Sequence, residues 1–135
     1  MKVRVVPITG APKTLSEVSP TIRIAHRPSR VLDFDIETVA AGFADPNWVP
    51  QKITCVAWSW IGEDKVECTI CGPEGIFGRP EARAEMLRPL LAAIDEADVL
   101  TGHNILRFDL PVLNAECMRL NLPLLKAIRV QDTMR

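Results

Sequence analysis

Two acidic residues sit inside an apolar run of this chain. The run VLDFDIET, residues 31–38, predicts a buried strand on which Asp35 and Glu37 lie two positions apart. Such side chains leave the same face of a sheet. Carboxylates held side by side repel and lose hydration, which is unfavourable unless a cation lies between them. Because Mg²⁺ and similar hard cations prefer oxygen ligands, the run predicts a central strand beside a metal site. The alternative is an exposed acidic face on an edge strand.

A second motif supplies a third carboxylate. Asn104 is followed, within the segment NILRFD, by Phe108 and Asp109. An Asp at the start of a helix is also an ordinary capping residue, so a cap is the alternative interpretation of Asp109. Three acids from distant points of one small chain nevertheless indicate a nuclease site of the two-metal kind.

These two motifs carry a resemblance to a known family. DFDIET resembles the first motif, and GHNILRFDLPVL the second motif, of the DEDD superfamily of 3′–5′ exonucleases, with a spelling closest to polymerase-type and phage-type members. The resemblance covers Val31 to Arg135. It implies an α/β ribonuclease H-like fold, with a mixed sheet in the order βββαβαβ and the C-terminal helix missing. It also implies hydrolysis at DNA 3′ ends.

The resemblance assigns roles to single residues. It implies that Asp35 contacts both of two Mg²⁺ or Mn²⁺ ions, that Glu37 binds the ion holding the nucleophilic water, and that Asp109 holds the other ion. Thr38, Asn104 and Phe108 would contact the 3′-terminal nucleotide, although packing in the core is an equal alternative for Phe108. We expect His103, which precedes the second motif, to be a hydrogen-bonded structural residue rather than a base.

The sequence departs from the family in one respect. The third family motif, Tyr-x-x-x-Asp or His-x-x-x-x-Asp, is absent from residues 31–135, and we expect Asp132 to cap a helix rather than replace it. We therefore expect an incomplete exonuclease domain that is poorly active alone. Two alternatives stay open: a non-catalytic nucleic-acid-binding or protein-docking module on the same fold, and a ribonuclease of the same superfamily, since nothing in the sequence reads a 2′ hydroxyl.

Periodicity and turn signals predict the elements. Strands are expected over 31–38, 53–60, 66–71, 99–101 and 127–130, and a loop over 40–51. A helix is expected over 81–97, kinked or restarted at Pro89. A second helix should begin near Asp109, with its apolar stripe on Leu106, Leu110, Leu113, Cys117 and Leu120.

The first 30 residues differ in charge from the remainder. They carry six Lys and Arg side chains against Glu17 alone, and four prolines. We expect a basic arm, residues 1–30, that attracts a phosphate backbone and so helps bind single-stranded DNA. The alternative is a merely solvated terminus. Residues 31–135 would form the nuclease domain, with a polymerase or a second copy of the chain as possible partners.

The cysteines and hydropathy bear on compartment and metal type. Cys68 and Cys71 form a CxxC without a second ligand pair, which argues against zinc, and Cys55 and Cys117 are expected in the core. No apolar stretch is long enough to span a bilayer, and the start does not resemble a secretory signal. These features predict a cytoplasmic protein, bacterial or from a phage-infected host, without a membrane partner.

Overall fold

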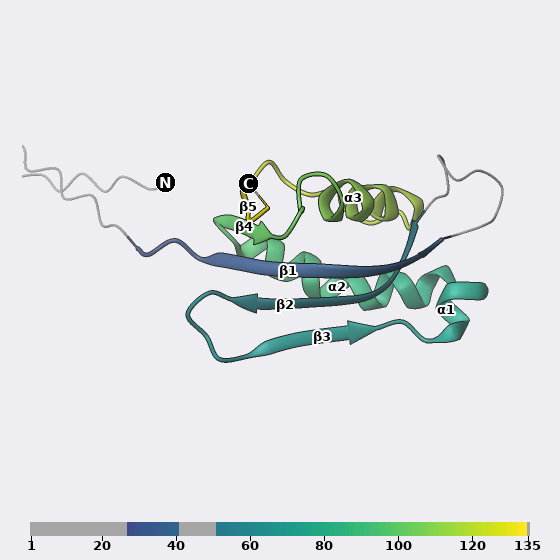
Figure 1. The fold of residues 1–135 in the computed structure, drawn as a ribbon. Helices are drawn as coiled ribbons and strands as arrows, with labels where there is room; N and C mark the ends of the chain where they lie inside the picture. The colour runs from purple at the N-terminus through teal and green to yellow at the C-terminus, as the bar shows by residue number, and fades with distance from the viewer. Residues whose placement is uncertain (1–26, 41–50, 135) are drawn as a thin grey trace, which may run out of the picture.

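The computed structural model describes residues 27–40 and 51–134, which form one mixed sheet and three helices (Figure 1). The sheet has five strands in the order β3-β2-β1-β4-β5. Its strands are β1 (Val31–Ala40), β2 (Gln51–Trp60), β3 (Val66–Ile70), β4 (Val99–Gly102) and β5 (Arg129–Asp132). β1 pairs antiparallel with β2 and β2 with β3, whereas β1 and β4, and β4 and β5, pair parallel. The acidic strand β1 is therefore central, as predicted.

Three helices complete the described part: α1 (Pro73–Phe77), α2 (Pro80–Glu96) and α3 (Asp109–Arg119). α2 and α3 both contact β2. The parallel strands β4 and β5 are joined through α3, whereas the chain between β1 and β4 runs through β2, β3, α1 and α2. Parallel strands need long crossover connections of this kind. The chain order is thus βββ, two helices, then βαβ, and only the short helix α1 was not expected from the sequence. Within the described ranges, every helix is too short or too polar to cross a lipid bilayer.

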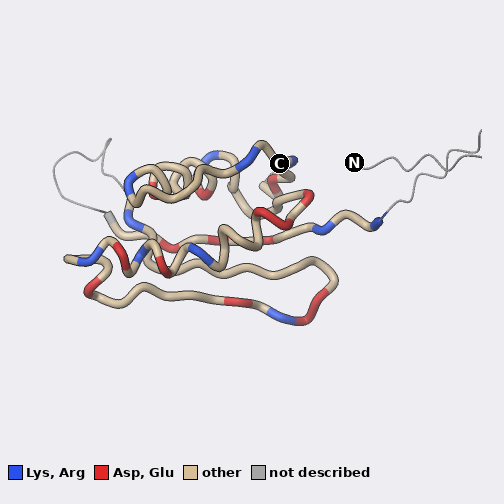
Figure 2. Tube along the Cα trace, turned by 180° about the vertical axis from the view of Figure 1, so that it is seen from behind, with Lys and Arg blue, Asp and Glu red and all other residues tan. Residues whose placement is uncertain are grey.

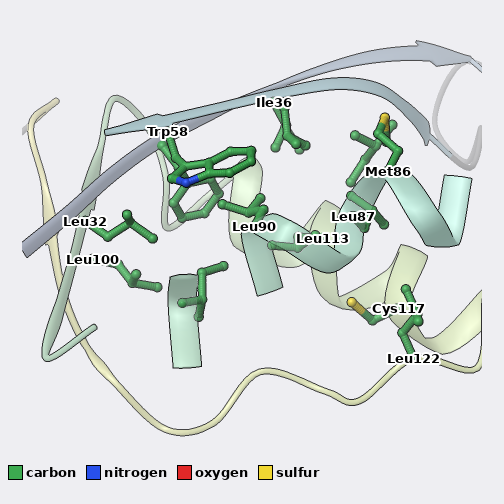
Figure 3. Close-up of a cluster of buried hydrophobic side chains, with 14 of the residues drawn as sticks. Leu32, Ile36, Trp58, Met86, Leu87, Leu90, Leu100, Leu113, Cys117 and Leu122 are labelled. Atoms are coloured by element: carbon green, nitrogen blue, oxygen red, sulfur yellow. The ribbon is translucent and has the colours of Figure 1, made fainter. Parts of the chain in front are cut away.

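The core lies between the sheet and the two longer helices (Figure 3). On β1 the side chains of Leu32, Phe34 and Ile36 are buried, at alternate positions that the pleat turns to one face. They pack with residues of β2, β4, α2 and α3, including Val56, Trp58, Leu87, Leu90, Ile94, Leu100, Leu113 and Cys117. Because this face is filled by apolar groups, the intervening residues of β1 must face the other side.

The end of the predicted basic arm contacts the body. Arg27 Nη2 lies 2.7 Å from Asp98 Oδ1, and the backbone N–H of Arg30 donates to Asp98 Oδ2 at 2.8 Å. The Arg30 guanidinium stacks over Trp60, 3.8 Å from the ring centroid. These contacts fix residues 27–30 at the junction of α2 and β4. The remainder of the arm, residues 1–26, and most of the predicted loop, residues 41–50, lie outside the described residues.

Several local expectations were wrong. α2 continues through Pro89, so the restart expected there as one of two alternatives is wrong. Glu85 and Pro89 are both exposed, so water can reach the carbonyl that the proline leaves without a donor. Leu106 is 39% exposed, because it belongs to the turn before α3 rather than to the helix stripe. Asp132 ends β5 and is followed by a turn, so it caps no helix in the described residues.

The expectation that Cys55 lies in the core was also wrong. It is half-buried on the face of β2 opposite the core, and its Sγ lies 3.5 Å from Sγ of Cys68 on β3. The register explains this, because Cys55 pairs with Glu37, an exposed residue of β1. Cys117 is fully buried, as predicted.

Candidate active site

The acidic pair of β1 lies on the face of the sheet opposite the core. Asp35 and Glu37 are exposed, whereas Phe34 and Ile36 between and beside them are buried. Their cross-strand partners on β2 are Ala57 and Cys55. Figure 2 shows the acidic positions along β1 in red. The two carboxylates therefore project together from the middle of the sheet, which is the arrangement that the spacing of two predicts.

Asp33 extends this acidic row by one more alternate position. It is half-buried, and burial, followed by the charge of Asp35, raises the pKa of its carboxyl above the ordinary value. Sequence analysis did not select Asp33. The same alternation that selects Asp35 and Glu37 would have found it, since all three residues lie two positions apart.

Asp109 is brought to the same strand from the start of α3. It is only 2% exposed, and its Oδ1 accepts a hydrogen bond from the backbone N–H of Ile36 at 3.2 Å. The paired positions of β1 and β4 end at Asp33 and Thr101, so Ile36 lies beyond the neighbouring strand. The carboxylate of Asp109 thus takes the acceptor position that a longer β4 would have provided. The capping residue of α3 is Phe108, so the helix-cap interpretation of Asp109 is wrong.

The pKa of Asp109 reports its surroundings. Burial raises it most; the hydrogen bond from Ile36 lowers it, and the charges of Asp35 and Asp132 raise it again. Asp35 and Asp109 therefore interact electrostatically across the edge between β1 and α3. A buried carboxylate whose pKa is raised by a neighbouring carboxylate favours a nearby cation or a retained proton.

The turn between β4 and α3 is held by Asp132. Its Oδ1 accepts from the N–H of Asn104 at 3.0 Å and its Oδ2 from the N–H of Leu106 at 3.2 Å. Asn104 has a positive φ of 59°, a conformation that Asn tolerates better than most residues. Sequence analysis missed this role because the two segments are distant in the chain. The end of β5 therefore fixes the turn that leads into Asp109.

The predicted substrate contacts lie around this turn and on β1. Asn104 is half-buried, and Phe108 is exposed rather than packed in the core. Thr38 is half-buried, and its hydroxyl donates to Gln51 Oε1 at 2.9 Å, next to a β-bulge between Glu37 and Thr38. His103 is exposed and has no hydrogen bond within the described residues, so the structural role expected for it is not seen there.

A buried ion-pair network positions α3 itself. Glu116 is fully buried; its Oε1 lies 2.6 Å from Arg83 Nε of α2, and its Oε2 lies 2.5 Å from Arg119 Nη2. Arg119 also donates to the backbone carbonyl of Gln51, at the start of β2. The network ties α3 to α2 and to β2. Because Asp109 opens α3, these ties contribute to where its carboxylate lies.

The ligand atoms that these residues offer are of the type that binds a divalent cation. Asp35, Glu37 and Asp109 offer only carboxylate oxygens, the ligands that Mg²⁺ and Mn²⁺ take. In the described part of the chain, however, no three His, Cys, Asp or Glu side chains are grouped closely enough to hold one ion. Asp35 and Glu37 are exposed, whereas Asp109 is buried and hydrogen-bonded to the backbone of Ile36. To be bound by all three carboxylates, a cation would thus require the two exposed side chains to move toward the buried one.

Comparison with known proteins gives structural matches only. No protein-family model matches this chain, and no curated protein matches its sequence. A family B DNA polymerase from the hyperthermophilic archaeon Pyrobaculum calidifontis matches 73% of this chain with a TM-score of 0.53 and 29% identity. E. coli Exonuclease I, in complex with a dT13 oligonucleotide, matches 78% with a TM-score of 0.52 and 20% identity. The chain covers 12% of the polymerase and 28% of Exonuclease I.

These matches agree with the topology described above. The chain has a mixed α/β fold of the ribonuclease H-like exonuclease type, as the two motifs predicted.

Proposed function

We propose that this chain is a metal-dependent 3′–5′ exonuclease domain that acts on DNA 3′ ends. The observation that carries the proposal is the approach of Asp109 to β1, where its carboxylate binds Ile36 N–H and interacts with Asp35. The likeness to Exonuclease I, which was solved with a dT13 oligonucleotide, supports single-stranded DNA as the substrate class. The likeness to a family B DNA polymerase supports a role beside DNA synthesis.

The proposed ligands are Asp35, Glu37 and Asp109. Two divalent cations held there would supply an activated water and stabilise the charge on the phosphoryl group and the leaving oxygen. The protein contributes a rigid platform, since Asp109 is buried and fixed while Asp35 and Glu37 stand on a central strand. Asp109 would remain ionised beside the cations, because their positive charge offsets the effect of burial on its pKa.

The residues around the turn would position the substrate. Phe108 is exposed next to Asp109, where its ring can stack on a terminal base. Asn104 is half-buried in the same turn and can donate from its amide to the nucleotide. Thr38 would need to release Gln51 before its hydroxyl could contact a nucleotide. We therefore propose that Phe108 and Asn104 contribute more to substrate binding than Thr38.

A slow reaction is part of the proposal. Asp132 is the further acid near Asp109, and it already accepts hydrogen bonds from two backbone N–H groups of the turn. It is therefore poorly placed to act as a general base. An enzyme that lacks a positioned base loses about 10²–10⁴-fold in rate. Because Asp132 does not supply such a base, we expect turnover to be slower by a factor of this order than that of an exonuclease with a positioned base.

One observation favours a second candidate function. Because no three acidic side chains of the described residues are gathered around one position, the fold could bind single-stranded nucleic acid without cleaving it. The two candidates differ in a simple way. An enzyme needs the carboxylates of Asp35 and Glu37, whereas a non-catalytic binding module does not.

The test is digestion of a 5′-labelled single-stranded DNA oligonucleotide in Mn²⁺ or Mg²⁺. The proposal predicts slow shortening from the 3′ end, lost in Asp35→Asn and retained in Glu63→Gln, an exposed acid in the turn after β2. A 3′-terminal phosphorothioate should slow the first step. Undigested DNA bound equally by wild type and Asp35→Asn would reject the enzyme and support the binding module. An RNA oligonucleotide of the same sequence decides between deoxyribonuclease and ribonuclease.

A further inference from the structure

Two free cysteines meet on the face of the sheet that carries the acidic row. Cys55 of β2 and Cys68 of β3 lie with their Sγ atoms 3.5 Å apart. The ladder places them on a diagonal, since Cys55 pairs with Ile70 and Cys68 pairs with Ala57. Diagonal neighbours on one face of an antiparallel pair are within side-chain reach.

The pair is open to reagents from solution. Cys68 is exposed and Cys55 is half-buried, whereas Cys71 and Cys117 are buried. The neighbouring side chain of Ile70 is 74% exposed, so the described residues do not cover this part of the face. Buried structural cysteines are chemically inert, whereas exposed paired thiols can exchange with disulfides. The two cysteines on this face therefore differ from the other two in accessibility and in having a thiol partner.

We propose that Cys55 and Cys68 form a reversible dithiol site that closes to a disulfide when it meets a small-molecule disulfide. A disulfide has an S–S distance of about 2.0 Å, so the sulfurs must approach from contact distance. The described residues leave this part of the face uncovered, and the core lies on the opposite face of the sheet. The proposal does not depend on the metal site or on nuclease activity.

The reaction proceeds in two balanced steps. The thiolate of Cys68, the more accessible sulfur, attacks one sulfur of the reagent, forms a mixed disulfide and releases one small thiol. Cys55 then loses its proton and attacks Sγ of Cys68, which forms the Cys55–Cys68 bond and releases the second small thiol. The two protein thiols are oxidised, and one reagent disulfide is reduced to two thiols.

The acidic row selects the reagent. Glu37 is the cross-strand partner of Cys55, and Asp35 that of Ala57, the neighbour of Cys68 in the ladder. Two carboxylates beside the thiols attract a cationic disulfide and repel an anionic one. We therefore expect faster closure with cystamine, which carries two ammonium groups, than with glutathione disulfide, which is anionic.

The experiment treats the native, full chain at low concentration with cystamine and follows the intact mass. The wild type should lose the mass of two hydrogen atoms and keep no adduct. Cys55→Ser should instead keep one cysteamine, and Cys71→Ser should close like the wild type. A non-reducing digest should join a β2 peptide to a β3 peptide, and dithiothreitol should reverse the change.

Three results would overturn the proposal. A stable cysteamine adduct on wild-type Cys68 would show that Cys55 cannot reach it. Closure that survives Cys55→Ser but not Cys71→Ser would assign the bond to the CxxC instead. Covalent dimers as the main product would show that Cys68 reacts between chains.

Discussion

The backbone N–H of Ile36 donates a hydrogen bond of 3.2 Å to the carboxylate of Asp109, 73 residues away in sequence. The pairing of β1 with β4 ends at Asp33, before Ile36. The carboxylate of Asp109 therefore accepts the backbone N–H that a longer β4 would otherwise have paired. The same geometry buries Asp109, and burial raises its pKa. Placement of the third acid thus costs stability when no cation is present, as is common where a protein prepares a charged site.

Asp109→Asn should stabilise the metal-free protein at neutral pH. The folded-state pKa of Asp109 is raised above 3.8, so the stability contributed by its protonated form is complete below that pH and is lost as pH rises through the folded pKa. Asn stays neutral and can still accept from Ile36. Thermal melts in a chelator should show a melting temperature higher by a few degrees at pH 7.5, with a smaller difference at pH 5. Asp64→Asn, in an exposed turn, is the control. A destabilised Asp109→Asn at pH 7.5 would contradict this account.

Asp132→Ala should loosen the turn before α3. It removes the acceptor for the N–H groups of Asn104 and Leu106, and for that of Met134 at 2.9 Å. A hydrogen bond to a charged acceptor contributes a net of about 1.5–3 kcal/mol. Because Asp132 is only half-buried and water can partly replace it as acceptor, we expect a total loss of about 1–3 kcal/mol in urea unfolding. Hydrogen exchange should accelerate at the amides of Asn104 and Leu106. Unchanged exchange at both amides would exclude this role.

Glu116→Ala should be the most destabilising of these variants. Glu116 is fully buried and pairs with Arg83, which is itself buried. Removing one partner of a buried ion pair leaves an uncompensated charge and costs about 3–5 kcal/mol. Denaturant unfolding measures this loss, and Glu85→Ala, an exposed glutamate of the same helix α2 as Arg83, should change stability by less than about 0.5 kcal/mol. Equal effects of the two substitutions would refute the structural importance of the pair.

Local pattern was sufficient for much of the fold. Alternation along 31–38 correctly predicted a central strand, because apolar residues at every second position need a covered face. The position of Asp109 at the start of a helix also followed from its neighbours. The restart offered as one alternative at Pro89 does not occur, because the cost of a proline depends on whether water reaches the freed carbonyl, which the sequence does not reveal.

The remaining errors concern long-range contacts. Cys55 was expected in the core, but the face of β2 on which it lies depends on pairing with Glu37 across the β1–β2 ladder. Asp132 was expected to cap a helix, but its carboxylate accepts a hydrogen bond from the backbone N–H of Asn104, in the turn between β4 and α3. Such partners become visible only when the strands are placed side by side. Element types therefore followed from sequence more readily than side-chain partners.

The central claim is that Asp35, Glu37 and Asp109 together bind divalent cations, and paramagnetic broadening of amide NMR signals by Mn²⁺ tests it most directly. Titration of the isotopically labelled chain should broaden signals at the middle of β1 and the first turn of α3, around Ile36 and Leu110. Asp35→Asn should abolish that broadening, and Glu63→Gln should not. Broadening centred on the acidic turn after β2, or equal broadening in wild type and Asp35→Asn, would contradict the account.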